Sequence, residues 1–303
     1  ERTGGNPFFI EEVVQALVEA GRLTGAKGAH RLAAPVDAIT IPATVTAVLA
    51  ARIDRLGERE KAVLQTAAVI GKEFTEPVLQ RVLGAHPALP VTGAELAAAL
   101  EALTSAEFLY PQALYPVAEY VFKHPLTQEV AYHSQLGDRR RQVHAAVARA
   151  LEALSATKLD EQAALLAYHW EAADEPFTAA DWHRRAAEWT GGRDRAETLR
   201  HWQQVRVLLA RVPESPETLA LGVLARAQMI RSGYLVGHTE EAATLFAEGM
   251  DLAERLGRPE SRVMLLAPYG IARCHAGALE EGLTHLSEAV RLARNALDAV
   301  DAP

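Results

Sequence analysis

The stretch "EFLYPQALYPVAEYVFKH" at residues 107–124 is the main signal for the fold that we predict for the first half of the chain. Aromatic and β-branched side chains lie on both sides of its proline-containing centre, a composition typical of two short strands joined by a loop. Apolar stripes with helical spacing precede it and predict helices over residues 42–56, 58–70, 75–83 and 93–106. Helices followed by a β-hairpin indicate a winged-helix domain.

The segment "GGNPFFIEEVVQALVEAG" at residues 4–21 has helix signals at both ends. Asn6 is a preferred capping residue, Pro7 fits the first helical position, and Gly21 supplies the stop. One face carries Ile10, Val13, Val14, Leu17 and Val18, and the opposite face carries Glu11, Glu12, Gln15 and Glu19. We expect the apolar face to pack on a partner. Because the chain has neither an initiator Met nor a signal peptide, we expect it to be a fragment of a longer protein.

A short hairpin is predicted after this helix, where "RLTGAKGAHRLA" at residues 22–33 places Leu23 and Leu32 on either side of a glycine-rich centre. From about residue 160 the sequence becomes uniformly helical. Shifting residues 237–257 by forty positions aligns Gly237 with Gly277 and six further identical pairs. This period is close to the ~34 residues of tetratricopeptide (TPR) repeats and the ~40–47 of other helical-pair arrays. The sequence therefore predicts a TPR-like superhelix with a concave binding surface, truncated at its end.

The overall composition indicates a soluble globular protein, with 49% hydrophobic and 23% charged residues among 303. No apolar run approaches the ~20 residues that span a bilayer, so we expect no membrane segment. Cys274 is the single cysteine, which excludes an intramolecular disulfide and favours a reducing cytoplasm. The formal net charge of −8 disfavours a chain devoted to nucleic acid. The one basic run, "GDRRRQVH" at residues 137–144, is predicted to be a solvated helix face.

Motifs of nucleotide hydrolysis and metal binding are absent from the sequence. The pair Gly71-Lys72 lacks the first glycine and the Ser or Thr of a phosphate-binding loop. No two histidines are three or four residues apart, so no helix offers a paired imidazole site for zinc. Cys274 and His275 are adjacent and diverge on a helix, which excludes a thiolate pair. We expect no catalytic set within this chain.

A winged helix raises the question of DNA binding, because its last helix would enter the major groove. That helix, "TGAELAAALEALTSAEF" at residues 92–108, carries Glu95, Glu101 and Glu107 and no Lys or Arg. Phosphate contacts depend on cationic side chains. DNA binding by this element is therefore disfavoured.

His124 in "VFKHPLTQEVAY" at residues 121–132 is the sharpest candidate for a binding residue. Pro125 suits the first position of a helix, which puts His124 at the cap, beside free amides and the positive end of the helix dipole. Two interpretations remain open on chemistry alone. The imidazole either donates to a nucleotide phosphate or simply caps its own helix.

Several blocks together resemble the STAND signal-transduction ATPases, in particular those found behind bacterial class III adenylate/guanylate cyclase domains. The blocks are "GGNPFFIEEVV", "IPATVTAVLAARIDRL", "AVLQTAAVIGKEF", "FKHPLTQEVAYHSQL" and "RRRQVHAAVARALE", which occur in this order between residues 4 and 154. The plan is similar to MalT-like regulators and NB-ARC switches, with an ATPase core, a winged helix that closes over the nucleotide, and sensing repeats. The resemblance implies a mainly α-helical chain with three parts, at residues 1–40 (end of the ATPase core), 41–157 (winged helix) and 158–303 (TPR-like repeats).

The resemblance also implies roles for individual residues. Gly5, Asn6 and Pro7 match the GxP motif, whose proline packs on adenine, and His124 matches the winged-helix histidine that contacts the β-phosphate of ADP. ATP or ADP, with Mg²⁺ held by the core, is the expected cofactor of the intact protein. Walker A, Walker B and the sensor arginine would lie upstream, so this chain alone is not expected to bind nucleotide strongly.

The implied function is regulation of an upstream effector, such as a nucleotide cyclase, by a protein or small-molecule ligand on the repeats. In this two-state switch, ADP holds the winged helix on the core and exchange to ATP frees it. Two alternatives stay open. One is a TPR-like interaction scaffold without nucleotide dependence, and the other is a fragment of a MalT/LuxR-like transcription regulator.

Overall fold

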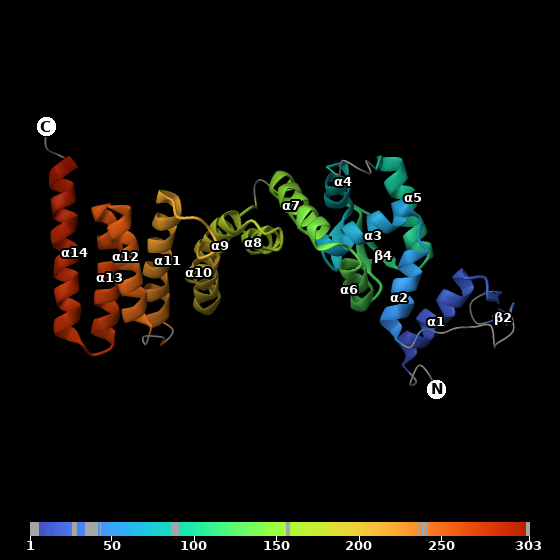
Figure 1. Cartoon of the computed structure of the whole chain (residues 1–303), viewed down its shortest axis with the longest axis horizontal. Coiled ribbons are helices and arrows are strands. Elements are labelled where there is room, and N and C mark those ends of the chain that lie inside the picture. Colours follow the sequence, from blue (N-terminus) through green and yellow to red (C-terminus); the bar gives the residue numbers. More distant parts are fainter. Residues whose placement is uncertain are drawn as a thin grey trace. The chain divides into compact units, whose positions relative to one another are not determined.

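The computed structural model describes residues 6–25, 29–33, 42, 44–85, 91–155, 158–235, 237 and 241–300, with side chains for all of these except 296–300. The chain is mainly α-helical and divides into two compact units, residues 1–154 and 155–303 (Figure 1). None of the described helices is long and apolar enough to cross a membrane.

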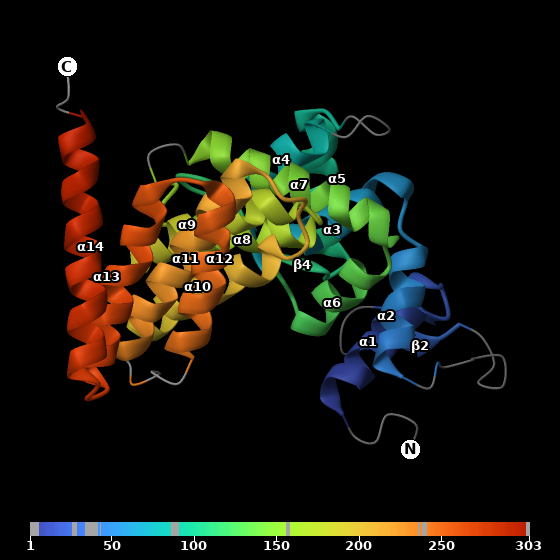
Figure 2. The same ribbon diagram turned by 60° about the vertical axis from the view of Figure 1, so that its left-hand side comes forward.

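The first unit begins with α1 (Pro7–Glu19), whose start follows the predicted signals. The Asn6 side chain accepts a hydrogen bond from the Phe9 amide at 3.2 Å, and Pro7 occupies the first helical position. Gly21 follows with φ of +65°, the left-handed conformation that favours glycine. The predicted hairpin is present as β1 (Leu23–Thr24) and β2 (Arg31–Leu32), which pair antiparallel. Figure 2 shows α1 beside α2 (Val45–Asp54), against which it packs.

A winged helix follows α1 and the hairpin, as the sequence predicts. Its elements are α2, α3 (Glu58–Ile70), β3 (Glu73–Thr75), α4 (Glu76–Gly84), α5 (Gly93–Ser105), β4 (Leu109–Ala113) and β5 (Glu119–Phe122). The strands form an antiparallel sheet in the order β3-β5-β4, so the wing hairpin gains a third strand that the sequence analysis missed. The predicted start of α2 at Pro42 was wrong, because the Thr44 hydroxyl caps the helix by accepting from the Ala47 amide at 3.2 Å.

The core of this unit lies between the helices and the sheet. Buried side chains from α2 to α6 (Pro125–His133) meet there, among them Leu49, Ile53, Leu64, Phe74, Leu79, Leu100, Phe108, Phe122 and Val130. The last helix of the unit is α7 (Gly137–Leu154), which packs against α3 and α4. The three arginines of the basic run begin this helix. Arg141 pairs with Asp138, and Arg140 donates to the Gln135 carbonyl at 2.8 Å.

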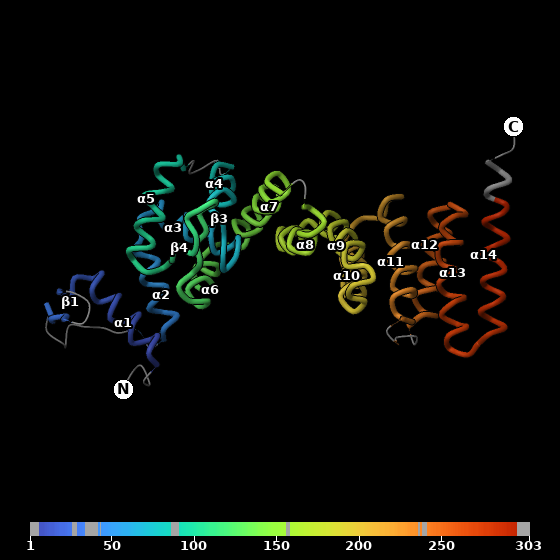
Figure 3. The backbone as a smooth tube through the Cα atoms, turned by 180° about the vertical axis from the view of Figure 1, so that it is seen from behind, coloured from blue at the N-terminus to red at the C-terminus, as the bar shows by residue number. Residues whose placement is uncertain are grey.

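The second unit consists of helices that pack on their neighbours along the chain (Figure 3). They are α8 (Ala163–Ala172), α9 (Pro176–Thr190), α10 (Arg195–Leu209), α11 (Pro216–Leu235), α12 (Ala242–Leu256), α13 (Pro259–His275) and α14 (Leu279–Val300). The repeat found in the sequence corresponds to α12 and α14. The two glycines that it aligns, Gly237 and Gly277, precede these helices and have φ of +84° and +85°. Both glycines thus have the left-handed backbone conformation that favours glycine.

Candidate functional site

Helix α1 is joined to α2 by a small apolar cluster. Phe9 and Val13 are buried against Val48, with Leu17 packed at the edge. Val13 and Leu17 belong to the predicted apolar face, but Ile10 from the same prediction is 45% exposed. The predicted polar face was wrong at Glu12, which is only 1% exposed. The buried face of α1 thus includes a carboxylate, and α2 supplies the charge that compensates it.

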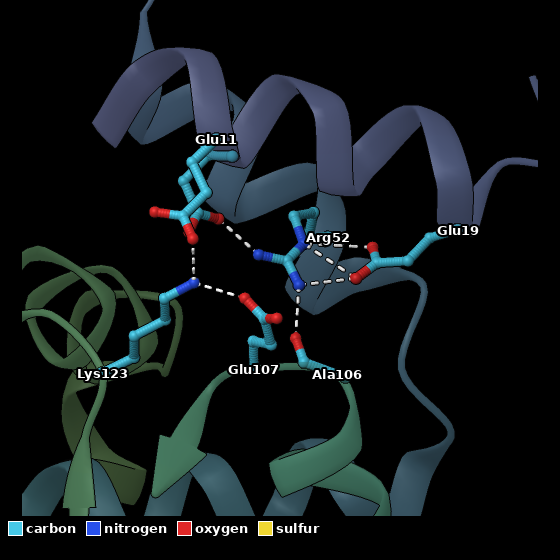
Figure 4. A network of polar contacts seen from close by, with 7 residues as sticks. Glu11, Glu19, Arg52, Ala106, Glu107 and Lys123 are labelled. Atoms are coloured by element: carbon cyan, nitrogen blue, oxygen red, sulfur yellow. Dashed lines mark hydrogen bonds and ion pairs between the residues drawn. The ribbon is translucent and has the colours of Figure 1, made fainter. Parts of the chain in front are cut away.

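That charge belongs to Arg52, which is 1% exposed and lies at the centre of a polar network (Figure 4). Its Nη1 donates to Glu12, its Nε donates to Glu19 at 2.9 Å, and its Nη2 donates to the Ala106 carbonyl oxygen at 2.6 Å. The guanidinium also lies 4.4 Å from the centre of the Phe108 ring. Burial raises the pKa of Glu12 against the opposing influence of Arg52. Arg52 therefore ties α1 to α2 and to the end of α5.

Lys123 forms a second connection between α1 and the winged helix (Figure 4). Its Nζ donates to Glu11 of α1 at 2.7 Å and to Glu107, the residue that follows α5 and its cap. Burial acts to lower the pKa of Lys123, but the bonds to Glu107 and Glu11 raise it above the ordinary value. The ammonium group therefore stays charged. Because Lys123 directly follows β5, its bond to Glu11 holds α1 against the end of this strand.

The third connection is a ring stack. Phe8 of α1 lies on the imidazole of His124, with ring centres 3.9 Å apart and an angle of 17° between the planes. His124 caps α6, because its Nδ1 accepts a hydrogen bond from the Leu126 amide at 3.1 Å. An accepting Nδ1 requires the proton of the neutral ring to lie on Nε2. Nε2 is thus a hydrogen-bond donor next to the start of α1.

The predicted nucleotide-contact residues are therefore brought together in part. Phe8, which directly follows Pro7 in the chain, stacks on His124, so this ring contact joins the end of the GxP segment to a residue far away in sequence. The Asn6 side chain is committed to capping α1. Gly5 lies outside the described residues. Nucleotide contact by these residues stays a prediction.

Arg52 and Lys123 were missed in the sequence analysis. Arg52 interrupts the apolar stripe of α2 between Leu49 and Ile53, and an arginine inside such a stripe is the signal that could have revealed it. Lys123 carries no comparable signal, because its partners come from distant segments. Within the described ranges, no group of three or more His, Cys, Asp or Glu residues is arranged to hold a metal ion.

No protein-family model matches the sequence, and no curated protein matches it. Among solved structures, the chain is similar to a Signal Transduction ATPase with Numerous Domains (STAND) protein with a tetratricopeptide repeat sensor from Pyrococcus horikoshii. The two share 11% identity with a TM-score of 0.34, over 85% of this chain and 47% of that one. The chain thus spans about half the length of the solved protein that it matches.

Proposed function

We propose that this chain is the regulatory and partner-sensing part of a STAND-type ATP-binding signal-transduction protein. Residues 1–40 would close the nucleotide-binding core, 41–157 form the winged helix, and 158–303 form the sensing repeats. The observation that carries the proposal is the stack of Phe8 on His124 at 3.9 Å, which joins the GxP segment to the winged helix.

The stack supports a nucleotide site shared by both segments. In the Gly5-Asn6-Pro7 motif, Pro7 would pack on the adenine, and the Nε2–H of His124 would donate to the β-phosphate of ADP. The start of α6 adds free backbone amides and a positive dipole end beside the same imidazole. The nucleotide supplies the phosphate charge, and Mg²⁺ would be held by residues of the core.

Regulation would follow from the contacts between α1 and the winged helix. Arg52 and Lys123 pair with carboxylates of α1, and these pairs would stabilise the ADP-bound form. A ligand of the repeats can shift this equilibrium only through a difference in its affinity for the two forms. An open groove of about 620 Å³ between α10, α11 and α12 is a candidate site for such a ligand. The regulated effector would be an upstream domain such as an adenylate/guanylate cyclase.

The test uses the full-length protein, including its ATP-binding core, and compares ADP dissociation among variants of His124. His124→Ala removes both the cap and the Nε2 donor, whereas His124→Asn keeps a good capping side chain and removes only the ring. Both variants are expected to release ADP about ten- to a hundred-fold faster, as expected for the loss of a hydrogen bond to a charged group. His133→Ala, at an exposed position at the end of α6, is the matched control. Unchanged ADP release in both His124 variants would refute the phosphate contact.

A further inference from the structure

Two buried histidines meet in the second unit, where no site was predicted. His183 of α9 is 9% exposed and His201 of α10 is 8% exposed. Their Nδ1 atoms lie 2.9 Å apart, which is hydrogen-bond distance. One Nδ1 must therefore donate a proton and the other must accept it. Because α9 and α10 pack side by side, residues eighteen positions apart become direct neighbours.

Each outer ring nitrogen faces a carboxylate. His183 Nε2 lies 3.3 Å from Glu171 Oε2 of α8, and His201 Nε2 lies 3.3 Å from Glu197 Oε1 of α10. Both carboxylates have a further donor or cationic partner. Gln204 donates to Glu171 at 2.9 Å, and Arg200 pairs with Glu197. The four side chains form a linear series, Glu171–His183–His201–Glu197, which we name the histidine relay.

The number of protons in the histidine relay is the decisive feature. Two of its links, from His183 to Glu171 and from His183 to His201, are hydrogen bonds that each need one proton, and the third, from His201 Nε2 to Glu197, is at ion-pair distance and becomes attractive only when this nitrogen carries a proton. Two neutral imidazoles carry only two N–H groups in total. If His183 donates to Glu171 and His201 donates to His183, then His201 Nε2 carries no proton and lies next to the Glu197 carboxylate. In the reverse arrangement, His201 donates to Glu197 and His183 donates to His201, and no proton is left between His183 and Glu171. The neutral pair therefore always leaves one acceptor facing another.

We propose that the histidine relay is a binding site for a single proton, shared between His183 and His201, which couples the packing of α8, α9 and α10 to pH. One added proton completes all three links and places a cation between two carboxylates. A second proton would put two N–H groups head to head across 2.9 Å, and so it would separate the rings. The site therefore accepts one proton and no more while the helices stay packed.

The surroundings set the pH range of proton uptake. Burial lowers the pKa of both rings, and for His183 the hydrogen bond to Glu171 opposes this effect. Arg200 also lowers the pKa of His201. The neighbouring arginines of α9 are engaged elsewhere, Arg184 with Asp181 and Glu188, and Arg185 with Asp160. In the described part of α11, which packs on α10, no charged side chain forms an ion pair with either ring. Uptake is therefore expected below the ordinary histidine value of about 6.5.

The test follows the ring nitrogens of the full chain by ¹⁵N NMR of the imidazoles as the pH is lowered. We expect His183 and His201 to titrate together and to take up one proton between them. Glu197→Gln supplies an amide N–H to the bare Nε2 of His201 and completes the relay without the added proton. Glu171→Gln does the same at His183, and its amide oxygen still accepts from Gln204. In both variants, the pH at which the pair takes up its proton is expected to fall by about one unit or more.

Glu188→Gln is the matched control, because Glu188 is an exposed carboxylate of α9 that pairs with Arg184 and not with the relay. It should leave the titration unchanged. Independent titration of the two rings, two protons taken up with the fold intact, or no shift in either glutamate variant would overturn the proposal. Since the probe is the proton and the readout is the ring itself, the result does not depend on the proposed nucleotide site.

Discussion

Arg52 is the residue on which the contact between α1 and the winged helix most depends. Replacing it by Met would keep the apolar stem but leave Glu12 buried without its cation. Breaking a buried ion pair in this way costs about 3–5 kcal/mol. We expect Arg52→Met to lower the free energy of unfolding of the first unit by this amount, measured by urea denaturation.

The control for this prediction is Arg59→Met, because Arg59 is 48% exposed in its pair with Glu95 and an exposed pair contributes at most about 1 kcal/mol. Adding Glu12→Gln to Arg52→Met should recover part of the loss, since the remaining side chain is then uncharged. If Arg52→Met costs no more than Arg59→Met, the network does not stabilise this contact.

Single residues could be predicted where their role is local. Asn6, Pro7 and His124 cap or begin helices within three residues of themselves, so sequence spacing was sufficient to identify them. Glu12 and Arg52 could not be predicted in the same way. Their burial depends on how α1 crosses α2. It could not be predicted, because the spacing of apolar residues shows only which side chains of one helix share a face. The meeting of His183 and His201 likewise depends on the register between two helices.

Elements were predicted well where their hydrogen bonds are local, as in the helices and both hairpins. Strand β3 was missed because it has three residues and pairs with β5, which is distant in sequence. At the other end of the chain, α13 and α14 approach each other at Gly270 and Gly282. A Cβ atom on Gly282 would lie 2.7 Å from the Gly270 carbonyl oxygen and would overlap Cys274 Sγ. The two helices can pack this closely only while both positions lack side chains.

Gly282→Ala is therefore expected to destabilise the second unit by about 1–3 kcal/mol, although alanine is the better helix former. Thermal unfolding followed by circular dichroism would measure the effect. Gly84→Ala is the control, because no atom lies within 4 Å of a Cβ built there and the change should be neutral or slightly stabilising. Combining Gly282→Ala with Cys274→Ala should restore part of the loss. A Gly282→Ala protein as stable as the parent would contradict the close approach of α13 and α14.

At the scale of the whole chain, the fold permits a function that the charge distribution opposes. A winged helix can place its last helix in a DNA groove, and here that helix is α5. Glu95 forms a capping box with Thr92 at its start, Glu101 is exposed along it, and Glu107 follows its end. The net charge of −8 adds repulsion at longer range. The acidic helix could be predicted from sequence alone, because surface charge needs no knowledge of packing.

We therefore predict that the purified chain does not bind duplex DNA at physiological salt, measured by a gel shift with labelled duplexes of mixed sequence. Lowering the salt concentration should not produce binding. A protein that contacts few phosphates releases few counterions, so its affinity for DNA rises little as the salt concentration falls. Glu101→Lys with Glu95→Gln gives a matched variant in which α5 becomes basic on its exposed face. If that variant binds weakly with a steep salt dependence while the parent does not, charge and not shape prevents binding. A salt-sensitive shift with the parent chain would instead favour the transcription-regulator alternative over a regulatory role that acts through protein contacts.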